Sequence, residues 1–291
     1  MTRPFICKFC LRRTPQYLSA RQYSSAIAPN SDPTTPTKIP LRDLSASDLS
    51  YYWDTPAPNA SQLTYAEKFF APSRHSPIKL WSAAKFRTTP LSSIEPEVAF
   101  LGRSNVGKSS LLNAVMGREM CWTSSKPGRT REMNAFGIGG TKGGESKIVL
   151  LDMPGYDSAH GLKKIDEDLL MLFRRYAIPH QVVVSKVDKF LFKNKRQAKS
   201  GVAPASISKL QHTLHGLRPL VQPDGRLEGP GALGEIVTCS GETSIGPGQK
   251  LGVNALRWAI LSAAGFDGNV EARRETLPQD ASISKEAQPT P

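Results

Sequence analysis

The chain of 291 residues is poor in cysteine and lacks a long hydrophobic run. Its four scattered cysteines exclude a fold held together by disulfide bonds. Cys7 and Cys10 have the spacing of half a zinc site, but no second Cys/His pair completes it. No segment approaches the roughly eighteen consecutive apolar residues of a membrane span, so we expect no membrane-spanning helix.

Acidic residues are absent from the N-terminus. The chain carries a formal net charge of +13, and no Asp or Glu precedes Asp32, although five Lys and Arg residues do. An acid-free N-terminus that contains arginine and serine is typical of a mitochondrial transit peptide, which we assign to residues 1–27. An ordinary basic tail is the alternative. We therefore expect a protein of the mitochondrial matrix.

Two further segments lack hydrophobic periodicity. Residues 28–61 are rich in Pro, Ser, Thr and Asp and predict a disordered linker, and the polar residues 267–291 predict a disordered tail. The intervening residues 62–266 are expected to form one domain, monomeric, with an N-terminal extension.

A glycine-rich loop follows the apolar run that begins at Val98. It has the pattern G-x-x-x-x-G-K-S and comprises Gly102, Arg103, Ser104, Asn105, Val106, Gly107, Lys108 and Ser109. Glycine allows the tight bend in which successive backbone N–H groups surround a pyrophosphate. Lys108 would then contact the β and γ phosphates, and the Ser109 hydroxyl would ligate Mg²⁺. A glycine-rich turn without a ligand is the alternative.

Strands and helices alternate after this loop. The pattern predicts strands at 98–101, 132–138, 147–152, 181–187 and 235–239, and helices at 108–116, 163–177, 205–216 and 252–264. Several of the strands are apolar almost throughout, which favours a sheet covered on both faces. The expected fold class is therefore α/β, a doubly wound sheet with helices on both faces.

Two polar motifs could complete a phosphate site. Asp152 and Gly155 form a D-x-x-G motif where a strand ends, so Asp152 can hold Mg²⁺ and the Gly155 N–H can face a γ-phosphate. The preceding loop contains Gly128, Arg129 and Thr130, and the Thr130 hydroxyl could be a further metal ligand. A plain surface loop is the alternative for that segment.

A third motif could select the base. Ser185, Lys186 and Asp188 end the next strand, where the Asp188 carboxylate can accept hydrogen bonds from N1–H and N2 of guanine, a pattern that adenine lacks. The Lys186 side chain would lie along the base. Backbone N–H groups of the segment Cys239-Ser240-Gly241 could reach the base oxygen.

These motifs together resemble the EngB/YihA family of GTPases, in its mitochondrial form. The resemblance rests on residues 96–110, Lys126-Pro127-Gly128-Arg129-Thr130, Asp152-Met153-Pro154-Gly155-Tyr156, residues 185–189 and Leu256-Arg257-Trp258. It implies GTP/GDP and Mg²⁺ binding, slow hydrolysis with Lys108, Thr130 and Gly155 as catalytic residues, and assembly of the large ribosomal subunit with ribosomal RNA or ribosomal proteins as partners. In related GTPases the residue matching Asn105 helps to bind K⁺.

One structural unit is missing from this pattern. Only 36 residues separate Asp152 from Asp188, too few for the two crossovers that a doubly wound GTPase needs there. The missing unit is a helix and one central strand, and the break falls beside Tyr156. We predict that the strand at 181–187 moves in beside the strand at 98–101.

Other functions remain open on the sequence. The missing unit favours, as one alternative, a nucleotide-dependent binding module without effective catalysis, and an ATP-using P-loop enzyme is a third possibility. A basic run could contact an RNA backbone or be a solvated loop; it comprises Lys189, Lys193, Lys195, Arg196 and Lys199.

Overall fold

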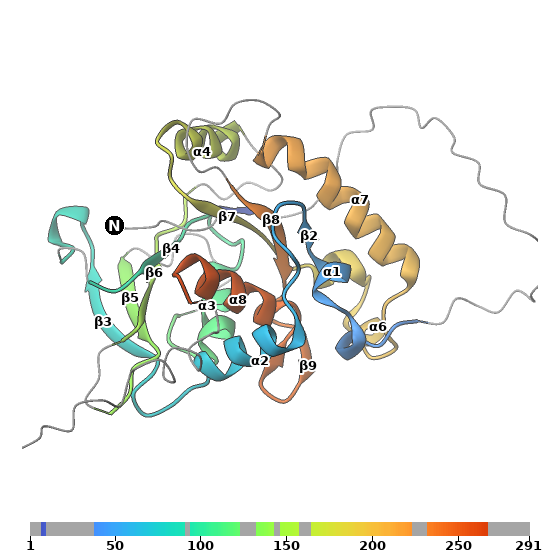
Figure 1. Cartoon of the computed structure of the whole chain (residues 1–291), viewed down its shortest axis with the longest axis horizontal. Helices are drawn as coiled ribbons and strands as arrows, with labels where there is room; N and C mark the ends of the chain where they lie inside the picture. Colours follow the sequence, from blue (N-terminus) through green and yellow to red (C-terminus); the bar gives the residue numbers. More distant parts are fainter. Residues whose placement is uncertain are drawn as a thin grey trace, which may run out of the picture.

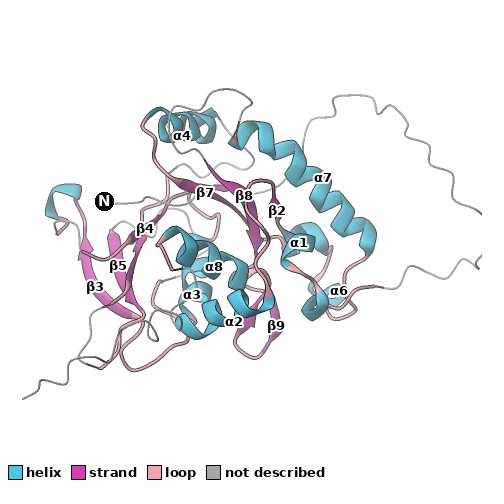
Figure 2. Ribbon diagram, in the orientation of Figure 1, coloured by secondary structure: helices cyan, strands magenta, loops and turns pink. Residues whose placement is uncertain are grey.

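The computed structural model describes residues 7–9, 38–90, 94–122, 132–142, 146–156, 164–222 and 232–266, with residues 7–9 as backbone only (Figures 1 and 2). The strands are β1 (Cys7–Phe9), β2 (Tyr51–Tyr52), β3 (Ile78–Ala83), β4 (Glu97–Phe100), β5 (Met133–Ile138), β6 (Ile148–Asp152), β7 (His180–Ser185), β8 (Ala232–Cys239), β9 (Ser244–Gly246) and β10 (Gln249–Lys250). The α-helices are α1 (Ala46–Leu49), α2 (Ala60–Phe69), α3 (Lys108–Met116), α4 (Lys164–Arg175), α5 (Asp188–Leu191), α6 (Lys195–Ala198), α7 (Pro204–Val221) and α8 (Val253–Ala263); the 3-10 turns are η1 (Leu41–Asp43) and η2 (Phe86–Thr88).

The main strands form two four-stranded sheets. One has the order β3-β5-β6-β4, in which β4 is parallel to β6, and the other has the order β1-β7-β8-β2, in which β7 is parallel to both β1 and β8. Helices cover both faces, as the sequence predicts. Val183 of β7 belongs to a core with α3 and α8, whereas its neighbours Val182 and Val184 belong to a core with α7.

The predicted position of the strand at 181–187 is wrong. β7 does not pair with β4; the edge of β7 away from β8 instead pairs with β1, in the register Cys7↔Val182 to Phe9↔Val184. The prediction considered only strands close to the break in sequence. An unpaired edge can be covered by any extended segment, and here the N-terminal residues supply its backbone partners.

Residues 38–61 differ from the predicted linker. Ser45 caps α1 by accepting a hydrogen bond from the Asp48 N–H, and β2 pairs antiparallel with β8. Leu49 is buried in the core beside α7, and the Thr238 hydroxyl donates to its carbonyl at 2.8 Å. The short elements were missed because tertiary contacts, rather than periodicity, stabilise them.

An arginine of α8 terminates the helix that follows the glycine-rich loop. The Arg257 guanidinium donates to the carbonyls of Val115 at 2.8 Å and Ala114 at 3.1 Å, which satisfies backbone acceptors at the end of α3. Burial lowers the pKa of Arg257 to about 10, so it stays cationic at neutral pH. The contact fixes the direction of α3, and with it the position of the loop at the other end of the helix.

Within the described ranges, no helix has the length and apolar character that crossing a bilayer requires.

Candidate nucleotide-binding site

The glycine-rich loop joins β4 to α3 in the bent form that its motif predicts. Gly107 lies immediately before the helix with φ +86°, and Asn105 also has a left-handed backbone, with φ +62°. The Lys108 ammonium donates to the Gly102 carbonyl at 2.9 Å and lies 3.5 Å from that of Arg103. Burial lowers the pKa of Lys108, and the nearby Asp152 carboxylate opposes that shift. The lysine is thus held at the start of α3, where backbone N–H groups point outward.

The two predicted metal ligands that the structure describes lie together. The Ser109 hydroxyl donates to Asp152 Oδ2 at 3.4 Å, so the first turn of α3 meets the end of β6. A hydroxyl and a single carboxylate fit Mg²⁺, which completes its shell with water and phosphate oxygens. The described ranges contain no group of three or more His, Cys, Asp or Glu that could hold a metal by itself.

The segment after Asp152 packs directly on the loop. The Ser104 N–H donates to the Tyr156 carbonyl at 2.7 Å, and the Ser104 hydroxyl donates to the Gly155 carbonyl at 3.2 Å. A Cβ at position 155 would lie 2.8 Å from the Ser104 backbone, so only glycine fits there. Gly155 is therefore adjacent to the loop, as a role in contacting a terminal phosphate requires.

Side chains at the end of β7 join the second sheet to the loop. The Ser185 hydroxyl donates to the Val106 carbonyl at 2.8 Å, and the Lys186 ammonium donates to the Asn105 carbonyl at 2.6 Å. Lys186 itself has φ +61°. Non-glycine residues with a left-handed backbone are energetically costly and concentrate at functional sites, and here two of them contact each other.

Asp188, the residue predicted to select the base, lies beside this junction. Asp188 lines a cleft of about 980 Å³ together with Lys189, Lys209 and Glu242. Asp188 is the first residue of α5, two positions after Lys186, which contacts the loop. The predicted guanine-binding carboxylate and the phosphate loop therefore belong to one region of the molecule.

The segment Cys239-Ser240-Gly241 differs in part from its predicted role. The Ser240 N–H donates to the Leu251 carbonyl at 2.8 Å and so is already used within the protein. Cys239 is buried, and its carbonyl accepts a hydrogen bond from the Val187 N–H at 3.3 Å. A Cβ at Gly241 would lie 2.9 Å from the Ser110 carbonyl, so this segment packs closely on the start of α3.

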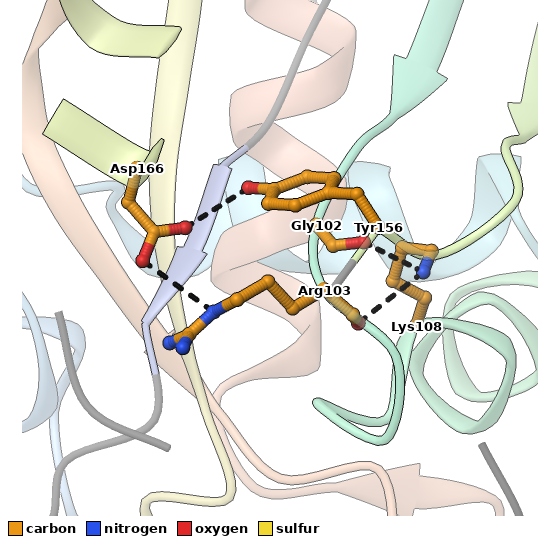
Figure 3. Close-up of polar contacts among 5 residues, drawn as sticks. All are labelled: Gly102, Arg103, Lys108, Tyr156 and Asp166. Carbon is orange, nitrogen blue, oxygen red and sulfur yellow. Dashed lines mark hydrogen bonds and ion pairs between the residues drawn. The ribbon is translucent and has the colours of Figure 1, made fainter. Parts of the chain in front are cut away.

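Three predicted site residues, Gly128, Arg129 and Thr130, lie outside the described residues. One residue of the site region was missed. Asp166 is fully buried on the face of α4 that also carries Leu170 and Phe173, and it contacts both Arg103 and Tyr156 (Figure 3). An acidic residue at a core-facing helix position is the signal that could have found it.

Comparisons with known proteins show which family this chain resembles. A family model described as "50S ribosome-binding GTPase" matches residues 97–210. The chain is 33% identical over 206 residues to the probable GTP-binding protein EngB of Bartonella bacilliformis, covering 58% of this chain and 84% of that protein. The corresponding protein of Bartonella quintana is 34% identical with the same coverage.

A third relative, the probable GTP-binding protein EngB of a Chelativorans strain, is 39% identical over 132 residues, 32% of this chain and 59% of that protein. Each alignment has more positions than this chain contributes residues, so this chain has gaps in it. Such gaps are expected if the relatives have a segment that this chain lacks. Among solved structures, a probable GTP-binding protein engB shares 17% identity over 62% of this chain and 94% of its own, with a TM-score of 0.20. Because the two Bartonella proteins share about a third of their aligned residues with this chain over most of their length, the chain belongs to the EngB family of GTP-binding proteins.

Proposed function

We propose that this protein binds GTP with Mg²⁺ through the residues described above. The observation that carries the proposal is the junction at the glycine-rich loop, where Ser185 and Lys186 donate to loop carbonyls at 2.8 and 2.6 Å. That junction brings the phosphate motif and the base-selecting motif into one site, although about 80 residues separate them in the sequence. Lys108 and the loop N–H groups would hold the phosphates, and Ser109 and Asp152 would hold Mg²⁺.

Calorimetric titration with GTP and ATP in Mg²⁺ buffer tests this proposal. We expect GTP to bind at least about 100-fold more tightly, because a site that pairs with the guanine edge leaves buried polar groups unsatisfied when it holds adenine. Equal affinity for the two nucleotides would contradict guanine selection and would favour the ATP-using alternative.

The substitution Asp188→Asn tests the same carboxylate more sharply. Asparagine can donate to a 2-oxo group, so the variant should lose GTP affinity by about 100-fold and gain affinity for xanthosine triphosphate. Glu242→Gln, which lines the same cleft, is the matched control and should keep the wild-type preference. An Asp188→Asn variant that still prefers GTP would remove Asp188 from the base site.

Hydrolysis by this site is expected to be slow. The residue after Gly155 is Tyr156 rather than glutamine, and its hydroxyl donates to Asp166 at 3.0 Å, so it is not free to orient a water molecule. Phosphate release over many turnovers distinguishes a slow GTPase from a binding module without catalysis. The short connection between Asp152 and Asp188 favours the second of these, a binding module without catalysis.

A potassium site at Asn105 is tested by single-turnover hydrolysis. Equal rates in Na⁺ and K⁺ would exclude it.

The cellular role that we propose is assembly of the large ribosomal subunit in mitochondria. It is supported by the description of the matching family model, by the net charge of +13 and by the acid-free N-terminus. Co-sedimentation with large subunits that depends on GTP, together with import and N-terminal processing by isolated mitochondria, tests the two parts separately. Binding that is equal with GTP and GDP would contradict a nucleotide-controlled role.

A further inference from the structure

Asp166 lies in the first turn of α4 and is fully buried. One of its oxygens, Oδ1, accepts a hydrogen bond from the Tyr156 hydroxyl at 3.0 Å, and the other, Oδ2, lies 3.4 Å from Nε of the fully buried Arg103 (Figure 3). A carboxylate removed from water is costly unless it is paired, and these two contacts supply its partners.

Both partners of Asp166 belong to the phosphate region. Arg103 is the second residue of the glycine-rich loop, and its carbonyl lies 3.5 Å from the Lys108 ammonium. Tyr156 directly follows Gly155, and its carbonyl accepts the Ser104 N–H at 2.7 Å. The backbones of Arg103 and Tyr156 also form a parallel bridge. The Asp166 carboxylate therefore contacts the side chains of two residues whose backbones lie side by side, one in the loop and one directly after Gly155.

This arrangement contributes more to geometry than to stability. Replacing a buried ion pair by apolar groups often changes stability little, whereas a paired carboxylate restricts its partners to a narrow set of positions. Gly155 is the residue whose N–H can reach a γ-phosphate, and the β-phosphate contacts come from the loop itself. Loosening the contact between Tyr156 and the loop should therefore lower the affinity for a nucleoside triphosphate more than the affinity for a diphosphate.

We propose that Asp166 is a positioning residue for the γ-phosphate contact: through Arg103 and Tyr156 it helps to hold Gly155 against the loop, and so influences the ratio of GTP to GDP affinity. The inference rests on the proposed function, because it concerns the same nucleotide site. It also assigns a role to α4, which follows the break in the family pattern.

The test compares three variants by titration with GTP and with GDP in Mg²⁺. Asp166→Asn removes the charge that faces Arg103, and we expect the ratio of GTP to GDP affinity to fall about tenfold, with GDP affinity nearly unchanged. Tyr156→Phe removes one hydroxyl and should lower the ratio about threefold. Glu167→Gln, an exposed change in the same helical turn, is the matched control and should keep the wild-type ratio.

The affinity ratio separates positioning from a purely structural role. If Asp166→Asn weakens GTP and GDP equally, or leaves both affinities unchanged, the proposal is overturned. If that variant does not fold, Tyr156→Phe decides, and a wild-type ratio in this milder variant overturns the proposal. Wild-type protein is titrated in parallel: absence of guanine nucleotide binding there refutes the proposed function itself, whereas normal wild-type binding with unchanged ratios in the variants refutes only the role of Asp166.

Discussion

The sheet β3-β5-β6-β4 and the sheet β1-β7-β8-β2 contribute to the candidate site in different ways. The first carries the candidate phosphate-binding residues, which lie on consecutive elements joined by short loops from β4 to α3 and from β6 to Gly155. The second carries the candidate base-selecting residues, and the side chains of Ser185 and Lys186 connect it to the loop. A motif can thus preserve a phosphate pocket locally, whereas the position of the base pocket depends on long-range contacts.

The largest effect is expected in the first sheet, from Lys108→Met. The substitution keeps much of the apolar stem but removes the ammonium group that would contact two phosphates, so GTP affinity should fall about a thousandfold. Fluorescent GTP titration measures the loss. Lys147→Met, an exposed lysine next to β6, is the control and should bind as the wild type does. A variant at Lys108 that binds GTP normally would mean that the loop is not the phosphate site.

In the second sheet, the strongest electrostatic effect is expected from Glu235 of β8. The side chain is 8% exposed and accepts a hydrogen bond from Thr55 at 2.9 Å, and burial raises its pKa to about 7 from an ordinary value of 4.5. The folded protein therefore retains a proton that the unfolded chain releases. The contribution of Glu235 to the free energy of unfolding is therefore greatest below pH 4.5. It falls by up to about 3 kcal/mol as the pH rises to 7.

The substitution Glu235→Gln should remove this part of the pH dependence. Denaturant unfolding of wild type and variant at several values between pH 5 and pH 8 measures the difference. Glu242→Gln, outside β8, should leave the slope unchanged. Equal slopes in wild type and Glu235→Gln would show that Glu235 is not buried in a protonated form.

The smallest expected effect concerns the edge of β7 that lies away from β8. Deleting residues 1–9 removes β1, the backbone partner of Val182 to Val184, and should lower stability by about 1 kcal/mol while the amides of β7 exchange faster with solvent. Deleting residues 1–6 leaves β1 in place and is the control. Identical exchange in the two truncated proteins would show that β1 does not cover this edge. The result also bears on the predicted transit peptide, because removing residues 1–27 would remove β1 as well.

Much of the fold could be predicted from local sequence. The helix at 108–116 has the predicted bounds, and the strands at 132–138 and 147–152 differ from β5 and β6 by one residue at the start, because apolar runs and glycines mark their ends. Helix α7 continues beyond its predicted end at 216 to Val221, and it contains Pro219, a residue type that usually ends a helix.

The sequence predicted some parts of the candidate site and missed others. The phosphate residues follow from motif spacing, since the geometry of such a loop depends on a few consecutive torsion angles. Asp166 could not be assigned to the site in this way, because its relation to Arg103 depends on how α4 packs, 63 residues further along the chain. The Ser240 N–H was assigned to the base, but the Leu251 carbonyl accepts it in the folded protein.

The sequence by itself determined the candidate chemistry of this protein: the glycines and lysine of the loop, the acid at 152 and the acid at 188 are residue types whose proposed role depends on a few neighbours in the chain. Tertiary structure alone decided how the two sheets are completed and joined. The unpaired backbone groups at an open strand edge can pair with any extended segment, so no sequence motif predicts that β1 pairs with β7. In the same way, a buried carboxylate takes whichever cationic and hydroxyl groups the packing brings to it.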